Sequence, residues 1–113
     1  MRTHYYKASL AKVVDAATEA ISDVNNCVVE DVDSIDDSHV LIIAVYLNEK
    51  KVKYVIWIGI AEFSKDNINV DVFSRSDSGI SSEHGRIAKD FFERLDNLLG
   101  VPARSSLQKT SSP

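Results

Sequence analysis

Two neighbouring segments, residues 39–47 and 52–61, constrain the fold most strongly, because each is apolar at both alternating sets of positions. β-Branched and aromatic residues dominate both segments, which is typical of β-strands. The apolar residues of the first segment include Val40, Leu41, Ile42, Ile43, Val45 and Tyr46. A strand with one hydrated face alternates apolar and polar side chains more regularly. The sequence therefore predicts that more than one layer must shield this strand pair from water.

Two further extended segments complete the predicted sheet. Residues 27–33 are rich in valine, and residues 68–73 alternate apolar with polar side chains. The links at residues 48–51 and 62–67 are short and polar. A parallel crossover needs about a dozen residues or more, so these links indicate antiparallel hairpins.

Helical periodicity flanks the extended segments on both sides. Apolar residues recur at spacings of three and four in residues 8–24, where Ser9 can cap the first turn. The same spacing recurs in residues 81–99, and Gly100 followed by Pro102 is a typical stop signal. An amphipathic helix is therefore predicted at each end of the strand region.

The predicted fold class is α+β, in the order α-β-β-β-β-α. A four-stranded antiparallel meander sheet forms one layer, and the N-terminal and C-terminal helices form the other. The length of 113 residues corresponds to one domain, expected over residues 8–100. Residues 1–7 are expected to form an N-terminal segment outside it. Residues 101–113 are polar enough that a disordered tail is expected.

Charge and cysteine content narrow the function classes. The net charge is -4, so the chain lacks the overall basic character that sequence-independent nucleic-acid binding requires, and a nucleic-acid partner is not expected. A single cysteine, Cys27, excludes an internal disulfide. The most apolar window, residues 52–61, contains Lys53 and is far shorter than the roughly 20 residues of a membrane-spanning helix. A cytoplasmic location is expected, with export only if a precursor signal had been removed.

The second face of the sheet is the first candidate site. An apolar face that the helices leave uncovered is available for a protein partner, for self-association as a dimer, or for a small apolar ligand. The residues assigned to this ligand or partner face are Ile42, Tyr46, Val55 and Trp57. The favoured function is a non-enzymatic binding or assembly module without a cofactor, and an enzymatic role is left open.

The turn at residues 74–86 is the second candidate site, for a small anion. Backbone amides at a helix start attract anions, and arginine adds charge-assisted hydrogen bonds. The candidate residues are Arg75, Ser76, Ser78, Gly79 and Arg86. An anion-binding domain or a small enzyme is the alternative function. An ordinary strand-to-helix turn with serine caps is the favoured interpretation of this segment, because it lacks the Gly-rich loop and lysine of a phosphate site.

Metal and RNA sites have weaker sequence support. The acidic run at residues 30–37 lacks the glycine and the closing glutamate of a calcium loop, so a solvated hairpin loop is expected. His4, His39 and His84 do not show metal-ligand spacing, and no metal is predicted. Strand aromatics can stack bases in sheet-type RNA binders, but core packing is the favoured role here.

The segment from the last strand to the last helix carries a family resemblance. The residues concerned are Arg75, Ser76, Ser78, Gly79, Arg86 and Ile87. In this pattern, and in the order of its elements, the chain resembles a family of small bacterial domains of unknown function. The resemblance implies the same helix, four-strand meander and helix over roughly residues 8–99. It implies no reaction.

Overall fold

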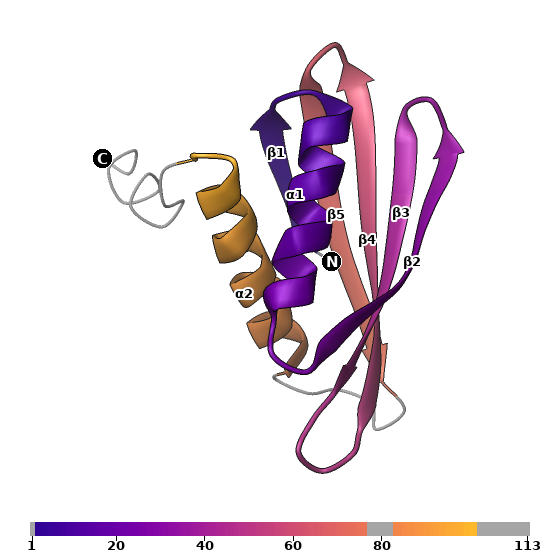
Figure 1. Cartoon of the computed structure of the whole chain (residues 1–113), viewed down its shortest axis with the longest axis vertical. Helices are drawn as coiled ribbons and strands as arrows, with labels where there is room; N and C mark the ends of the chain where they lie inside the picture. The colour runs from indigo at the N-terminus through magenta and orange to yellow at the C-terminus, as the bar shows by residue number, and fades with distance from the viewer. Residues whose placement is uncertain (1, 77–82, 102–113) are drawn as a thin grey trace.

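The computed structural model describes residues 2–76 and 83–101. Two helices pack on one side of a single antiparallel sheet, which confirms the α+β class (Figure 1). The elements in chain order are β1 (Arg2–Lys7), α1 (Leu10–Asp23), β2 (Cys27–Asp36), β3 (His39–Leu47), β4 (Lys53–Ser64), β5 (Asn67–Ser76) and α2 (Glu83–Leu98).

The sheet has five strands in the order β1-β5-β4-β3-β2, so the prediction of four strands is wrong. The added strand, β1, pairs antiparallel with β5, from Arg2 opposite Val72 to Lys7 opposite Asn67. Residues 2–7 therefore belong to the sheet. No hairpin joins β1 to its neighbour, and its pairing partners lie 60 to 70 residues further along the chain, so local sequence patterns carry no signal for it.

Side chains of β1 also contact α2. The buried Tyr6 hydroxyl donates a hydrogen bond of 2.7 Å to a carboxylate oxygen of Asp96, which is itself buried. The His4 ring stacks on Phe92 with centroids 3.7 Å apart. These contacts hold the edge strand against the last helix, so the start and the end of the described chain stabilise each other.

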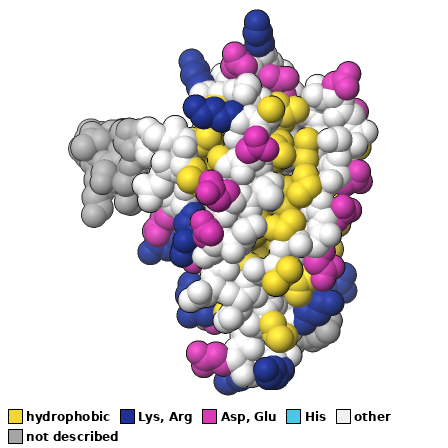
Figure 2. Space-filling model, viewed as in Figure 1, with side chains coloured by type: hydrophobic (Ala, Val, Ile, Leu, Met, Phe, Trp, Pro, Cys, Tyr) yellow, Lys and Arg dark blue, Asp and Glu magenta, His cyan; other side chains and the backbone are white. Residues whose placement is uncertain are grey.

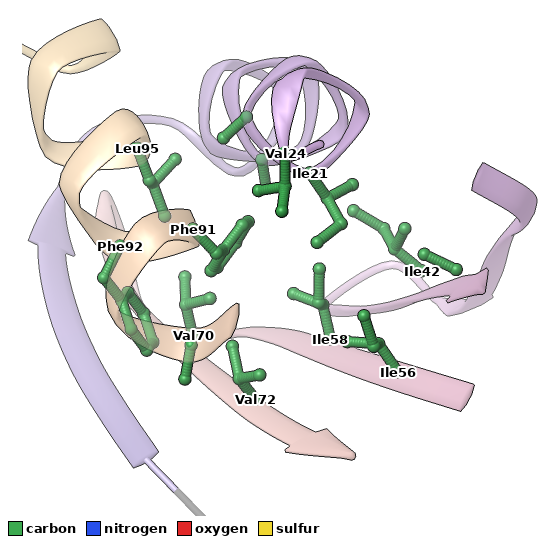
Figure 3. Packing of buried hydrophobic residues seen from close by; sticks show 14 of the residues in the cluster. Ile21, Val24, Ile42, Ile56, Ile58, Val70, Val72, Phe91, Phe92 and Leu95 are labelled. Carbon is green, nitrogen blue, oxygen red and sulfur yellow. The ribbon is translucent and has the colours of Figure 1, made fainter. Parts of the chain in front are cut away.

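The core lies between the helices and one face of the sheet. Helix side chains point toward the strand side chains across this layer (Figure 3). The labelled core residues are Ile21, Val24, Ile42, Ile56, Ile58, Val70, Val72, Phe91, Phe92 and Leu95. Burial of this many aliphatic and aromatic side chains is the main favourable term for a chain of this size.

The helix ends follow their sequence signals. Ser9 caps α1, because its hydroxyl oxygen accepts a hydrogen bond from the Lys12 amide at 3.2 Å. Gly100 has φ 70° after α2, and the Val101 amide donates to the Asp96 carbonyl at 2.8 Å. That combination closes the helix in the left-handed conformation that glycine allows. The disordered tail is expected over residues 101–113. Apart from Val101, these residues lie outside the described part of the chain.

The strands bury alternate residues on the helix side and leave the other set on the opposite face. In β4, for example, Ile56 and Ile58 are fully buried, whereas Val55 and Trp57 are only partly buried. No helix or strand within residues 2–76 and 83–101 covers this opposite face (Figure 1). No helix in these ranges is long and apolar enough to span a membrane.

Candidate functional site

The uncovered side of the sheet, here called the open face, has an aromatic centre. Strand register places Ile43 opposite Trp57, and Trp57 opposite Phe73, in one row across β3, β4 and β5. The Trp57 and Phe73 rings lie 5.6 Å apart at an interplanar angle of 40°. Phe73 is 48% exposed although it is a large apolar side chain. This row is therefore a preformed apolar surface.

One neighbouring row is aliphatic and ends in a cation. Val45 pairs with Val55, and Val55 pairs with Arg75. Both valines are partly buried, and Arg75 is exposed. The apolar surface of the central row thus extends toward the end of β5, where the guanidinium group forms its rim.

The row on the other side of the aromatic row contains a glycine and a carboxylate. Leu41 pairs with Gly59, and Gly59 pairs with Asp71. A Cβ added to Gly59 would meet no atom within 4 Å, so this position is a shallow hollow in the open face. The Thr3 hydroxyl contacts the Asp71 carboxylate and keeps this charge on the same face.

The β2 edge of the open face is acidic. Asp31 pairs with Ile43 and Asp33 pairs with Leu41, and both carboxylates are exposed. Register shifts between Val29 and Asp31 and near the end of the strand interrupt the β2–β3 ladder. Charges and bulges at an edge strand oppose pairing with another chain's edge. The β2 edge is thus poorly suited to pairing with a strand of another chain.

The four residues predicted for the ligand or partner face are divided between the two sides of the sheet. Val55 and Trp57 lie on the open face. Ile42 and Tyr46 lie beneath the helices, with exposures of 0% and 7%. Side chains of a strand alternate between faces, so these two cannot share a surface with Trp57. Leu41, Ile43 and Val45 complete the face on β3 and could have been found by requiring one alternating set. Phe73 completes it on β5, where only the strand register aligns it with Trp57.

A second apolar area is visible on the helix side. Figure 2 shows hydrophobic side chains in a band down the middle of this side of the molecule, with charged side chains around it. Among the exposed apolar residues, Val32 is on the helix side of β2, opposite the buried Ile42. α1 leaves the outer part of β2 without cover.

The residues predicted for the anion site are not brought together where the structure describes them. Arg75 lies on the open face, opposite Val55. Ser76 lies opposite Tyr54, on the side that carries the helices, and Arg86 belongs to α2. Ser78 and Gly79 lie outside the described residues. The two guanidinium groups therefore belong to opposite faces of the sheet.

Arg86 already has an anionic partner. Its Nη2 donates to the Glu83 carboxylate oxygens at 2.6 Å and 2.5 Å, and the Tyr46 hydroxyl donates to Glu83 at 2.8 Å. The hydrogen bond from Tyr46, followed by that from Arg86, lowers the pKa of Glu83. Burial and Glu83 raise the pKa of the Tyr46 hydroxyl. This cluster lines a cavity of about 900 Å³ between α2 and the β3–β4 hairpin.

One more polar contact lies next to this cluster. The Ser74 hydroxyl contacts Nδ1 of His84, and the His84 ring packs edge-on against Tyr54 with centroids 5.0 Å apart. Neither this pair nor the Tyr46–Glu83 pair is predicted by the sequence. They join the sheet to the first turn of α2, and no periodic pattern signals such contacts.

Cysteine and metal chemistry have little support in the described chain. Burial, and to a lesser extent the Asp90 carboxylate, raises the pKa of the Cys27 thiol to about 11. The thiol is therefore a poor nucleophile at neutral pH. Within the described ranges no group of three or more His, Cys, Asp or Glu residues could hold a metal ion.

Comparison with known proteins finds no matching protein-family model and no significant match to a curated protein or a solved structure. The resemblance to a bacterial domain family thus stays an expectation from sequence, and the function is argued from the site alone.

Proposed function

We propose that this protein is an assembly module that docks onto an apolar protein surface through its open face. The observation that carries the proposal is the row of Ile43, Trp57 and Phe73 on a sheet side without a covering element in the described chain. Water in contact with such a row is unfavourable, and contact with a second apolar surface removes it.

The composition of the open face is that of a protein interface. Aromatic anchors at the centre and polar or charged residues at the rim are typical of such surfaces. Trp57 and Phe73 supply the anchors, and Arg75, Asp71 and Asp31 supply the rim. The aliphatic residues between them belong to strands, so the surface is held rigid before any partner arrives, and little conformational entropy is lost on docking.

A protein surface fits the open face better than a small apolar ligand does. Small-molecule sites are concave and enclose most of the ligand. Two cavities in the described chain lie beside Tyr46 and beside Lys7, and neither is lined by Trp57 or Phe73. A broad sheet surface instead suits a partner of comparable breadth.

Site-specific photocrosslinking in cells that naturally make the chain tests this function. Phe73 is replaced by photoreactive p-benzoylphenylalanine, and the same replacement at the exposed Lys89 of α2 is the control. A discrete protein adduct formed from position 73 and not from position 89 is the expected result. Adducts from neither position, or equally from both, would remove the proposal.

The alternative, anion binding at residues 74–86, has less support. Arg86 is neutralised by Glu83, and Arg75 lies on the other face of the sheet. What favours a small-molecule site near this segment is the cavity of about 900 Å³ beside Tyr46. Its lining carries both signs of charge, which suits a small polar ligand better than a simple anion.

A further inference from the structure

We infer that the occupant of the open face is the same face of a second copy of this chain, related by a two-fold axis along the Ile43–Trp57–Phe73 row. The inference rests on the proposed function and gives it a partner. In a two-fold interface, residue i of one copy meets residue j of the other, and j meets i. Positions at equal distance on either side of the axis must therefore be complementary.

The β5 positions satisfy this condition by charge. Arg75 and Asp71 lie two residues to either side of Phe73 on the open face. Rotation about the row places the Arg75 guanidinium over the Asp71 carboxylate of the second copy, and the reverse pair forms as well. Two charge-assisted contacts thus flank the aromatic centre.

The β4 positions satisfy it by shape. Val55 and Gly59 lie two residues to either side of Trp57. The same rotation places Val55 over the hollow at Gly59, where an added Cβ would have no neighbour within 4 Å. The Val55 side chain of each copy thus fills the space at Gly59 of the other copy. Such filling of empty space by apolar groups is what close packing requires.

The β3 positions are both aliphatic. Val45 and Leu41 lie two residues to either side of Ile43, and all three are partly buried. The rotation brings Val45 against Leu41 of the second copy. The three central strands are therefore self-complementary about the aromatic row. The complementarity is one of charge in β5, of shape in β4 and of apolar character in β3.

A two-fold axis parallel to the strands, along the central strand β4, fits less well. That rotation places β5 of one copy over β3 of the other. Asp71 then approaches Leu41, and Arg75 approaches Val45. Each charge would be covered by an aliphatic side chain without an opposite charge, which is unfavourable, whereas the axis along the aromatic row pairs Arg75 with Asp71.

The available area indicates a weak dimer. Strands β2 to β5 extend to both sides of the aromatic row, whereas β1 pairs only with residues 67–72 of β5. Four strands about 4.8 Å apart and roughly eight residues of about 3.3 Å each give a face on the order of 500 Å² per copy. Mutual cover therefore buries about 1,000 Å² in total, at the lower limit for specific interfaces. Reversible, concentration-dependent association is expected.

Sedimentation velocity of the purified full chain over roughly two decades of concentration tests the inference. A monomer–dimer equilibrium is expected. Arg75→Glu and Asp71→Arg should each weaken it by at least about tenfold, because each places like charges opposite one another. The double variant restores the pairs with reversed sign, so its dimerisation should return toward that of the parent chain.

Gly59→Val gives an independent test. The added side chain occupies the hollow that receives Val55 and should weaken dimerisation by at least about tenfold, by analogy with overpacked cores. Folding should not be impaired, because no atom of the same copy lies within 4 Å of the new Cβ apart from those of the adjoining residues in the chain. Circular dichroism of this variant verifies the fold, so a loss of association cannot come from unfolding.

The results separate this inference from the proposed function. If the chain stays monomeric at every concentration while position 73 crosslinks a different protein, the inference of a homodimer is overturned. The proposed docking onto a partner protein is then retained. A dimer that survives Arg75→Glu, or that the double variant does not restore, overturns the axis. A monomer without adducts from position 73 overturns both.

Discussion

The hydroxyl of Tyr6, on the first strand, donates a 2.7 Å hydrogen bond to the carboxylate of Asp96, on the last helix. Both side chains are buried, so the bond joins the two ends of the described chain inside the core. Tyr6→Phe removes the donor, so the buried Asp96 carboxylate loses this hydrogen bond. We expect a loss of about 1–3 kcal/mol in the free energy of unfolding, measured by urea denaturation at neutral pH.

Tyr5→Phe is the matched control for that measurement. Tyr5 is 63% exposed on the same strand, so loss of its hydroxyl should cost little. Equal destabilisation by the two variants would contradict the role assigned to the Tyr6–Asp96 bond.

Gly59→Val should stabilise the monomer while it weakens association. Glycine inside a strand is unfavourable, and valine is among the best strand residues. Because nothing lies within 4 Å of the new Cβ, the gain should approach about 1 kcal/mol. Urea denaturation at a concentration low enough to keep the chain monomeric measures it. A destabilised variant would mean that the position is not open.

Glu83 should make the free energy of unfolding decrease at acidic pH. Its pKa is lowered from 4.5 by hydrogen bonds from Tyr46 and Arg86, so its contribution is present above the unfolded-state pKa and is lost as pH falls through the folded-state value. Glu83→Gln should therefore destabilise the protein at pH 7 and should do so less at pH 3. Denaturant midpoints of both proteins at both pH values provide the comparison, and a pH-independent difference would be inconsistent with it.

Cys27 should resist modification in the native state. A thiol with a pKa of about 11 is roughly one-thousandth ionised at pH 8. We expect alkylation by iodoacetamide to be far slower than in urea, where the chain is unfolded. A native rate close to that of the unfolded chain would show that the thiol is accessible and ionised.

Asp31→Asn should strengthen self-association at low salt. Asp31 pairs with Ile43, so the two-fold axis along the aromatic row brings Asp31 near its own copy at the rim. Neutralising it removes a like-charge contact, which is worth a few-fold in affinity and is screened by salt. Sedimentation at low and at high ionic strength tests this. An unchanged or weaker dimer at low salt would speak against the proposed axis.

Much of this fold could be predicted because its signals are local. Enrichment in β-branched and aromatic residues, together with short polar links, identifies β2 to β5, and spacings of three and four identify both helices. The β1 strand was missed because Thr3, His4 and Tyr5 carry no apolar period, and only the distant β5 gives them a partner.

The candidate site was predicted in part for a different reason. Apolar character on both faces of β3 and β4 indicates a second surface, but it does not say which residues share it. Assigning Ile42 and Tyr46 to the side of Trp57 ignored strand alternation, which places them under the helices. Register between strands, which aligns Phe73 with Trp57, comes only from the structure.

The edge position of β1 also has a consequence for synthesis. During translation β1 leaves the ribosome before the other described elements, yet Lys7 pairs with Asn67 and Arg2 with Val72. The strand has to wait, unpaired, until some sixty more residues have been added, and its contact with Asp96 comes later still. Such long-range closure slows folding. We therefore expect β1, although it is synthesised before the other described strands, to be among the last to pair in the sheet.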